Sequence, residues 1–255
     1  GRNTGIATGM LGNSARLLLK THGGERTVRL QQLAIQGLSL FEELVKEHGI
    51  DCDYERNGRL VIAENSKAVK LLEQEAKACE EIGAPVTLLD RQEVRKRFGS
   101  LDAFAGLYAP DEGMLNPAKF VRGMKKVVES LGVEVYEHSR CTHIEPGPTV
   151  SLYTPLACVR ATNIVMATNA YENPLGILRY KVLPFYVYNI ATEPLTERQM
   201  NEFHSAGGFA VFNQKNLFWA LRPTADNRVV FIENDALYFY HVDRDYSHRP
   251  REYRS

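Results

Sequence analysis

The sequence predicts an α/β protein in which helices and strands alternate in the first half and strands dominate the second. Helical spacing of apolar residues recurs three times before residue 133, and a glycine follows each pattern. Strand-like runs rich in Val, Phe and Tyr succeed one another from residue 181 onward. This order favours a mixed α/β and α+β architecture, with an α/β core and an attached antiparallel β layer.

The expected helices begin or end at recognisable signals. Asp90 and Glu93 form a capping-box pair at the start of one short helix, and Asn116 with Pro117 marks the start of another. Residues 1–24 are rich in Gly, Asn and Thr, so we expect a loop there that leads at most into a short helix. The helices expected from apolar spacing cover residues 25–48, 66–82, 117–131 and 196–203.

The expected strands are short and bounded by turn residues. Asn57-Gly58 stands between two strand-like runs and tolerates positive φ at both turn positions, so it predicts a hairpin. The other strands are expected at residues 86–89, 104–110, 133–139, 141–144, 150–153, 163–168, 181–192, 208–212, 217–223 and 228–234.

Composition excludes several classes of protein. The 255 residues include 31 basic and 31 acidic ones, and this zero net charge argues against a nucleic-acid-binding protein. No run approaches the roughly 18 apolar residues of a membrane span. The four cysteines lie far apart and form no C-x-x-C pair, which argues against a disulfide framework and favours a reducing compartment, expected to be the cytoplasm.

Both ends of the chain favour an internal segment of a longer protein. The first residues already form a glycine-rich functional loop, and they lack the charged and apolar regions of a signal peptide. The last residues are polar and contain neither a helix stop nor a strand pattern.

Few catalytic motifs are present. The sequence contains no G-x-S-x-G elbow, no G-K-[ST] phosphate loop and no H-x-x-x-H pair among its seven histidines, so we expect no bound metal. The N-terminal GRNTG is more informative, because its glycines permit a tight backbone and Arg2 carries a planar fork suited to phosphate or carboxylate. Such a loop could wrap a phosphorylated cofactor; the alternative is an ordinary surface turn.

Two further segments could face a ligand. In IVMATNAYENP an apolar strand runs into the small residues Ala167, Thr168 and Asn169, and ligands of open α/β sheets lie just beyond such strand ends. In LFWALRP, Trp219 could line an aromatic pocket and Arg222 could bind an anion. The two are three residues apart, so on a regular strand they face opposite sides. The alternatives are a buried strand with a turn, and a packed Trp with a surface Arg.

Taken together, these segments resemble the D-amino-acid-oxidase-like family of FAD-dependent oxidoreductases, and above all its amine oxidases of the gamma-glutamylputrescine-oxidase type. The matching pieces, which follow one another from Gly1 to about Phe231, are GRNTG, NGRLVIA, GMLNPAKFVRGM with GVEVYEHSRCTHIE, IVMATNAYENPL, VLPFYVYNIATEPL and WALRPTADNRVVF. The residues after Phe231 depart from the family pattern, because IENDALYFY stands where the family has a glycine-rich turn.

The resemblance implies two domains. A truncated Rossmann-like FAD-binding domain would comprise residues 1–48 and 111–178, and a mixed, largely antiparallel substrate domain residues 49–110 and 179–255. The family's G-x-G-x-x-G fingerprint does not occur in this chain. We therefore expect the segment by itself to bind FAD poorly and to be inactive, whereas the parent protein binds FAD.

The resemblance also implies roles for individual residues. Arg2, Asn3, Thr4 and Gly5 would lie near the flavin and the pyrophosphate. Cys141 would meet the adenine end through its backbone, and Ala167, Thr168 and Asn169 would lie beside the dinucleotide. The residues implied for substrate binding are Tyr186, Tyr188, Trp219 and Arg222.

The implied reaction is oxidation of the C–N bond of a small amine or amino acid. Hydride passes from the carbon beside nitrogen to the flavin, and the resulting imine hydrolyses. No acid–base pair is required to stand out in the sequence, since the cofactor carries the difficult chemistry. Two alternatives remain open: a flavin enzyme acting on a hydroxy acid or a polyol phosphate, and a non-catalytic α/β module without cofactor.

Overall fold

The computed structural model describes residues 3–12, 14–97, 102–169, 181, 185–186, 189–204, 208–214, 218–232 and 237–238. Contacts within the chain divide it into two compact units. The first unit combines Gly1–Val133 with Tyr188–Asp235, and the second combines Glu134–Val187 with Ala236–Ser255. These boundaries differ from the expected FAD-binding and substrate ranges, whose functional assignment stays a prediction.

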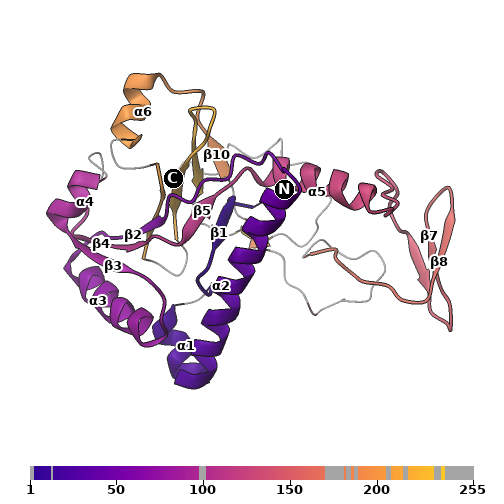
Figure 1. Ribbon diagram of the computed structural model, residues 1–255, viewed down its shortest axis with the longest axis horizontal. Coiled ribbons are helices and arrows are strands. Elements are labelled where there is room, and N and C mark those ends of the chain that lie inside the picture. Colours follow the sequence, from indigo (N-terminus) through magenta and orange to yellow (C-terminus); the bar gives the residue numbers. More distant parts are fainter. Residues whose placement is uncertain are drawn as a thin grey trace. The chain divides into compact units, whose positions relative to one another are not determined.

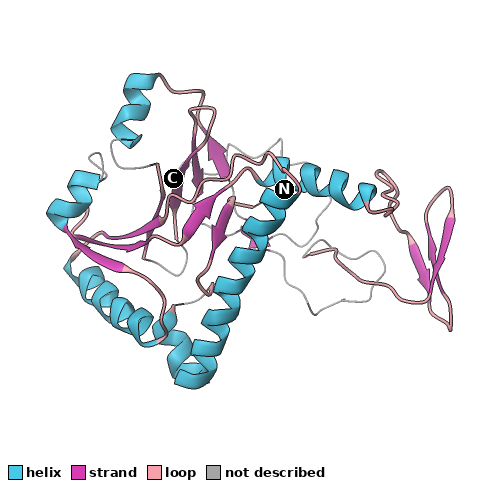
Figure 2. Ribbon diagram, viewed as in Figure 1, coloured by secondary structure: helices cyan, strands magenta, loops and turns pink. Residues whose placement is uncertain are grey.

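The helices confirm the start and stop signals of the sequence (Figure 2). Asp90 and Glu93 exchange the two reciprocal bonds of a capping box, at 2.8 and 2.9 Å. Asn116 Oδ1 accepts bonds from the backbone N–H groups of Ala118 and Lys119. The helices are α1 (Ala15–His22), α2 (Gly24–Glu47), α3 (Ser66–Glu81), α4 (Arg91–Arg97), α5 (Pro117–Ser130) and α6 (Glu197–His204).

A seven-stranded mixed sheet forms the core of the first unit. Its strand order is β10-β13-β12-β11-β2-β4-β3, and every neighbouring pair is antiparallel except β11 and β2, which run parallel. The strands are β2 (Arg59–Ala63), β3 (Thr87–Asp90), β4 (Ala105–Ala109), β10 (Asn189–Ala191), β11 (Ala210–Asn213), β12 (Ala220–Pro223) and β13 (Val229–Ile232).

Helices cover both faces of this sheet. On one face Leu60 and Ile62 of β2 pack with Val94 of α4, and on the other Ala63 packs with Leu72 of α3. This alternation is the period of two that a strand buried on both faces requires. Figure 1 shows α3 beside β3 and β4, and α1 between α2 and α3.

A short ribbon lies against the sheet beside α2 and carries the N-terminal loop. It consists of β1 (Ile6–Thr8) paired antiparallel with β5 (Glu112–Met114). Its apolar side chains join a cluster with the sheet residues Ala220 and Phe212. A loop was expected where β1 lies, because three residues are too few for a strand pattern.

The second unit contains two small antiparallel sheets. One is a meander of β6 (His143–Glu145), β7 (Val150–Tyr153) and β8 (Cys158–Ala161), and the other pairs β9 (Phe185–Tyr186) with β14 (Leu237–Tyr238). β6 and β7 match the expected strands at 141–144 and 150–153, whereas β8 was not expected.

Two predicted strands, at residues 133–139 and 163–168, are wrong. Neither segment belongs to a strand, and Val165 is 89% exposed although it was expected to be buried. A strand needs a neighbour that accepts its backbone hydrogen bonds, and no described strand pairs with either segment.

The predicted Asn57-Gly58 hairpin is also wrong, although the glycine is required. Residues before Asn57 do not pair with β2; instead Glu55 forms an isolated bridge with Met114. Gly58 has φ +81°, and its N–H donates to the Glu112 carbonyl at 2.7 Å. The turn therefore sends the chain from the ribbon into the sheet.

None of the helices in the described part of the chain combines the length and the apolar character that a membrane crossing requires.

Gly58 provides a test of the packing at this turn. A Cβ there would meet the Tyr108 ring at 2.5–2.6 Å, and that ring is held by its hydroxyl bond to the Asn57 carbonyl. We expect Gly58→Ala to lower the free energy of unfolding by about 2–4 kcal/mol, from backbone strain together with overpacking. Urea unfolding of the purified protein measures this loss.

Gly49→Ala is the matched control, because Gly49 has φ +58° but no atom within 4 Å of its Cβ position. It isolates the backbone strain, for which we expect about 1 kcal/mol. Equal losses in the two variants would show that contact with Tyr108 is unimportant.

Candidate functional site

The candidate site is a cavity of about 280 Å³ in the first unit. This volume is near the lower end of the roughly 300–1,000 Å³ typical of ligand pockets, so the cavity suits a small molecule. Its walls come from the segment after α2, the junction of β5 with α5, and the turn between β12 and β13. The charged or amide side chains among its lining residues are Asp53, Glu55, Asn116, Arg222, Asp226 and Asn227.

Arg222 is the buried cation of this cavity. It lies on β12, is only 9% exposed, and its Nε has no hydrogen-bond partner among the residues that the structure describes. Burial lowers the pKa of Arg222, and the charges of Asp53 and Asp226 raise it. A guanidinium keeps its proton under such conditions. The cavity therefore contains a desolvated positive charge that can bind an anion.

The N-terminal loop lies directly against Arg222. Gly5 has φ +72°, and a Cβ there would lie 2.3 Å from the Leu115 carbonyl oxygen and 3.3 Å from Arg222 Nη2. The loop is held in place because the Leu115 N–H donates to the Gly5 carbonyl at 2.9 Å and Asn3 Oδ1 accepts from the Gly5 N–H at 2.8 Å. Only glycine fits this position.

Two acidic residues, Asp53 and Glu55, line the cavity from the segment that follows α2. Asp53 has φ +52° and accepts a 2.5 Å bond from Lys119 Nζ of α5. Glu55 is exposed, and its Oε2 accepts from Asn57 Nδ2 at 2.8 Å. Its backbone position is fixed, because Glu55 and Met114 exchange two backbone bonds of 2.9 and 2.8 Å.

Asp53 and Glu55 were not among the predicted site residues, although the sequence contains a signal for them. Asp51, Asp53 and Glu55 alternate with the apolar or aromatic Cys52 and Tyr54. Such alternation indicates an extended segment with one polar and one packed face. Cys52 is 1% exposed and Tyr54 packs with it, whereas Asp51 and Glu55 are exposed. The positive φ of Asp53 interrupts the extended backbone between them.

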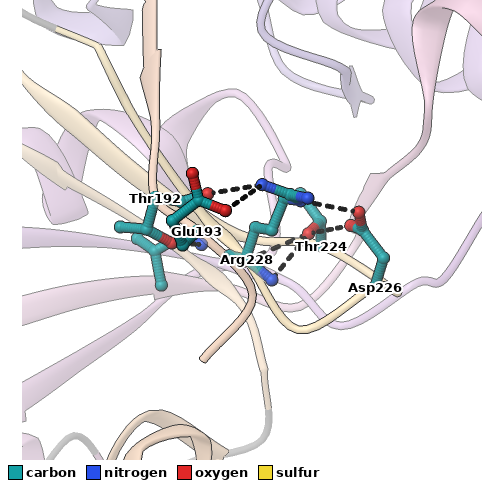
Figure 3. A network of polar contacts seen from close by, with 6 residues as sticks. Thr192, Glu193, Thr224, Asp226 and Arg228 are labelled. Carbon is teal, nitrogen blue, oxygen red and sulfur yellow. Dashed lines mark hydrogen bonds and ion pairs between the residues drawn. The ribbon is translucent and has the colours of Figure 1, made fainter. Parts of the chain in front are cut away.

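A polar network fixes the turn that forms the other wall (Figure 3). Arg228 donates from Nε to Asp226 at 2.9 Å and from Nη1 to the Thr192 carbonyl at 2.8 Å. Thr224 donates to Asp226 at 2.6 Å. These bonds lower the pKa of Asp226. These bonds therefore hold the conformation of the turn and also connect it to the segment after β10.

Trp219 and Arg222 lie on opposite faces of the sheet, as their spacing predicts. Trp219 packs against the cluster of Leu60 and Ile62, and its Nε1 donates to Glu64 at 3.0 Å. Arg222 shares the other face with Ala220, which packs with Met114. Trp219 therefore does not line the cavity of Arg222, and its role in substrate binding stays a prediction.

The remaining predicted site residues are divided between the two units. Asn3, Thr4 and Gly5 belong to the first unit, whereas Cys141 and residues 167–169 belong to the second. Cys141 Sγ contacts the His143 carbonyl at 3.4 Å, and Ala167, Thr168 and Asn169 are exposed. Arg2 and Tyr188 lie outside the described residues, and Tyr186 is described only as part of β9. The convergence of both groups on one dinucleotide stays a prediction.

The ribbon of β1 and β5 contains a second buried ionisable group, the carboxyl of Glu112. Glu112 of β5 is 1% exposed and lies 2.8 Å from Arg59 Nε of β2. Burial raises the pKa of Glu112, and this effect outweighs the lowering by Arg59 and by a bond from Thr8. The ribbon therefore carries a carboxyl that holds its proton more tightly than in water.

Comparison with known proteins places these observations in a family. A family model described as FAD dependent oxidoreductase (DAO) matches residues 1–254. Gamma-glutamylputrescine oxidoreductase of Escherichia coli is 28% identical over 235 residues, which cover 91% of this chain and 54% of that protein. The probable oxidoreductase OrdL of Haemophilus influenzae is 26% identical over 239 residues, covering 91% and 55%. The chain spans about half the length of these curated relatives.

Solved structures share the fold. Glycine oxidase from Geobacillus kaustophilus superposes with a TM-score of 0.68 at 19% identity, covering 94% of this chain and 61% of that chain. L-proline dehydrogenase from P. horikoshii gives 0.67 at 15% identity, with the same coverages. The mixed α/β fold expected from the sequence is therefore confirmed.

The buried Glu112 predicts a specific pH dependence of stability. Because its pKa is raised in the folded protein, the unfolded chain releases this proton first as the pH rises above the ordinary value of 4.5. The contribution of Glu112 to the free energy of unfolding then falls with pH until the folded pKa is passed. We expect Glu112→Gln to remove this fall, measured by urea unfolding over a pH series.

Asp226→Asn is the comparison variant, because the stability contributed by Asp226 changes with pH in the opposite direction to that of Glu112. The pKa of Asp226 is lowered from 3.8, so its stabilisation is present above that pH and is lost as the pH falls. A wild-type slope retained in Glu112→Gln would show that Glu112 is not the group responsible.

Proposed function

This chain belongs to the family of FAD-dependent oxidoreductases, and we propose that the protein that carries it oxidises the C–N bond of a small amine or amino acid. Relatives named as amine and amino-acid oxidoreductases support this reaction class. The substrate carbon beside nitrogen loses hydride, and the resulting imine is hydrolysed by water to a carbonyl compound and ammonia or an amine. We place the protein in the cytoplasm, a choice supported by its unpaired cysteines.

FAD, when bound, supplies the acceptor for the hydride. At Gly5 the space that a side chain would occupy is filled by the Leu115 carbonyl and by Arg222, so this glycine holds the loop where Asn3 and Thr4 would meet the edge of such a group. Asn3 and Thr4, together with Arg2, would hold the cofactor on this side. Cys141 and the turn of Ala167, Thr168 and Asn169 would meet the dinucleotide, as the family resemblance implies.

Arg222 would bind and orient the substrate. Its guanidinium faces a small cavity, lacks a bond at Nε within the described chain, and presents donors in the fork geometry that matches a carboxylate. Holding the carboxylate fixes the rest of the substrate relative to the loop, and orientation of this kind supplies much of the rate enhancement. Tyr186, Tyr188 and Trp219 would form other parts of the substrate domain.

One contact supports the proposal most strongly. Gly5, in the loop assigned to the cofactor, lies against Arg222, on the strand assigned to the substrate, although 217 positions separate them in the sequence. A cofactor and a substrate that react must lie side by side, and these two segments do so.

Product analysis of the purified full-length protein tests the reaction. Amines and amino acids should bleach the visible flavin band without oxygen, and turnover should release ammonia or an amine. Bleaching by hydroxy acids or polyol phosphates without nitrogen release would favour the alternative substrate class. A protein without a flavin band would favour the non-catalytic module.

Gly5→Ala tests the cofactor-side role of the loop. The new Cβ would collide with the Leu115 backbone at 2.3 Å and adopt a strained φ, so the loop must shift. We expect the flavin-to-protein ratio of the purified protein to fall by half or more, roughly the effect of 1–2 kcal/mol on a marginal binding equilibrium. Gly12→Ala is the control, because no atom lies within 4 Å of its Cβ position. An unchanged ratio in Gly5→Ala would remove the loop from the cofactor site.

Arg222→Ala tests the substrate-side role. We expect KM for an amino-acid substrate to rise roughly 10- to 100-fold, the loss of one charge-assisted contact. KM for an amine without a carboxylate should change little, since that substrate has nothing for Arg222 to bind. Steady-state kinetics on both substrates measure the difference, and an equal rise for both would show a structural rather than a binding role.

A further inference from the structure

Some of the charged side chains that line the Arg222 cavity already have an ion-pair partner. Four charged side chains line it: Asp53, Glu55, Asp226 and Arg222. Asp53 is paired with Lys119 at 2.5 Å, and Asp226 is paired with Arg228 at 2.9 Å. Each of these acids therefore already has a cation as a partner, and each of these cations also has a second, more distant acid, Asp51 for Lys119 and Glu193 for Arg228.

Two charges of opposite sign remain for a ligand. Arg222 has no ion pair with any described acid, and Glu55 has only the neutral amide of Asn57 as a side-chain partner in the described part of the chain. The charged groups of the cavity without an ion-pair partner in the described chain are thus one cation and one anion, and a ligand that pairs with both must itself carry both charges.

The two residues also lie at different depths. Arg222 is 9% exposed and belongs to the inner part of the cavity, whereas Glu55 is exposed and belongs to its mouth. The backbone of Glu55 is fixed by its two bonds to Met114, and that of Arg222 by its place between β11 and β13. The fold therefore fixes the two backbone positions from which these side chains reach the cavity.

From this arrangement we infer that Glu55 is a specificity-determining residue, which binds the cationic nitrogen of a substrate whose carboxylate is held by Arg222. The ligand class is a small zwitterion that enters with its carboxylate first. This inference rests on the proposed function for the identity of the site, and it goes further in selecting amino carboxylates over simple amines. A simple amine would leave the buried guanidinium without an anion. Binding of such a ligand is disfavoured because an unpaired, desolvated charge is energetically costly.

A matched pair of ligands separates the role of Glu55 from that of Arg222. The probes are glycine with acetate, and β-alanine with propanoate, which differ within each pair by the amino group. Binding to the purified full-length holoprotein is measured by ligand-observed NMR titration, which does not require turnover. Wild type should bind each amino carboxylate more tightly than its partner without nitrogen.

Glu55→Gln should weaken the amino carboxylates about tenfold, as loss of one charge-assisted contact predicts, and should bind acetate and propanoate no more weakly than wild type. Arg222→Ala should weaken both members of a pair. Glu73→Gln, an exposed residue of α3 away from the cavity, is the matched control and should change neither.

The inference is overturned if Glu55→Gln weakens both members of a pair alike, or weakens neither. It is also overturned if wild type binds none of the four probes. In that case the proposed oxidation of C–N bonds is still judged independently by the release of ammonia or amine. Conversely, a protein that binds zwitterions through Glu55 but releases no nitrogen product would refute the proposed reaction and leave this subsite intact.

Discussion

A guanidinium with little access to water is the constraint around which the first unit is arranged. Removing such a charge from solvent costs several kcal/mol unless nearby groups stabilise it. Around Arg222 that stabilisation comes from the charges of Asp53 and Asp226, which are themselves paired with Lys119 and Arg228. These acids stabilise the charge without an ion pair to it, and Nε of the guanidinium has no hydrogen-bond partner in the described part of the chain.

The mixed sheet makes this arrangement possible because it brings distant segments to one edge of a cavity. β12 supplies Arg222, the β12–β13 turn supplies Asp226, and the ribbon of β1 and β5 brings Gly5 alongside. The ribbon depends in turn on Glu112, whose buried carboxyl lies beside Arg59 of β2. The cavity thus depends on contacts that involve two strands of the sheet, β12 and β2, and both strands of the ribbon.

Local signals predicted the helices well and the strands less well, for a physical reason. Caps such as Asn116 and the pair Asp90–Glu93 act within one turn of helix, so the sequence beside them contains all that matters. A strand requires a partner elsewhere in the chain, and the apolar runs at 133–139 and 163–168 have none among the described strands. The spacing of apolar residues indicates which side chains can be buried, but it does not identify the strand with which a segment pairs.

The site shows the same division between local and distant information. Strand alternation placed Trp219 and Arg222 on opposite faces correctly, because that relation is internal to one segment. The contact of Gly5 with Arg222 was not predicted, since no local pattern links the two residues. Glu55 was missed because the Asn-Gly pair beside it indicated a hairpin, whereas its true backbone partner is Met114.

The parallel pairing of β2 with β11 has a consequence for how the polypeptide reaches this state. Leu60 lies opposite Val211, so the middle of the sheet closes a loop of about 150 residues, and such non-local pairing slows folding. During synthesis β2, β3 and β4 emerge long before β11, β12 and β13, which leaves one edge of β2 without its neighbour. An apolar strand edge that waits in this way is a template for self-association, and it makes nascent chains of this protein candidates for chaperone capture.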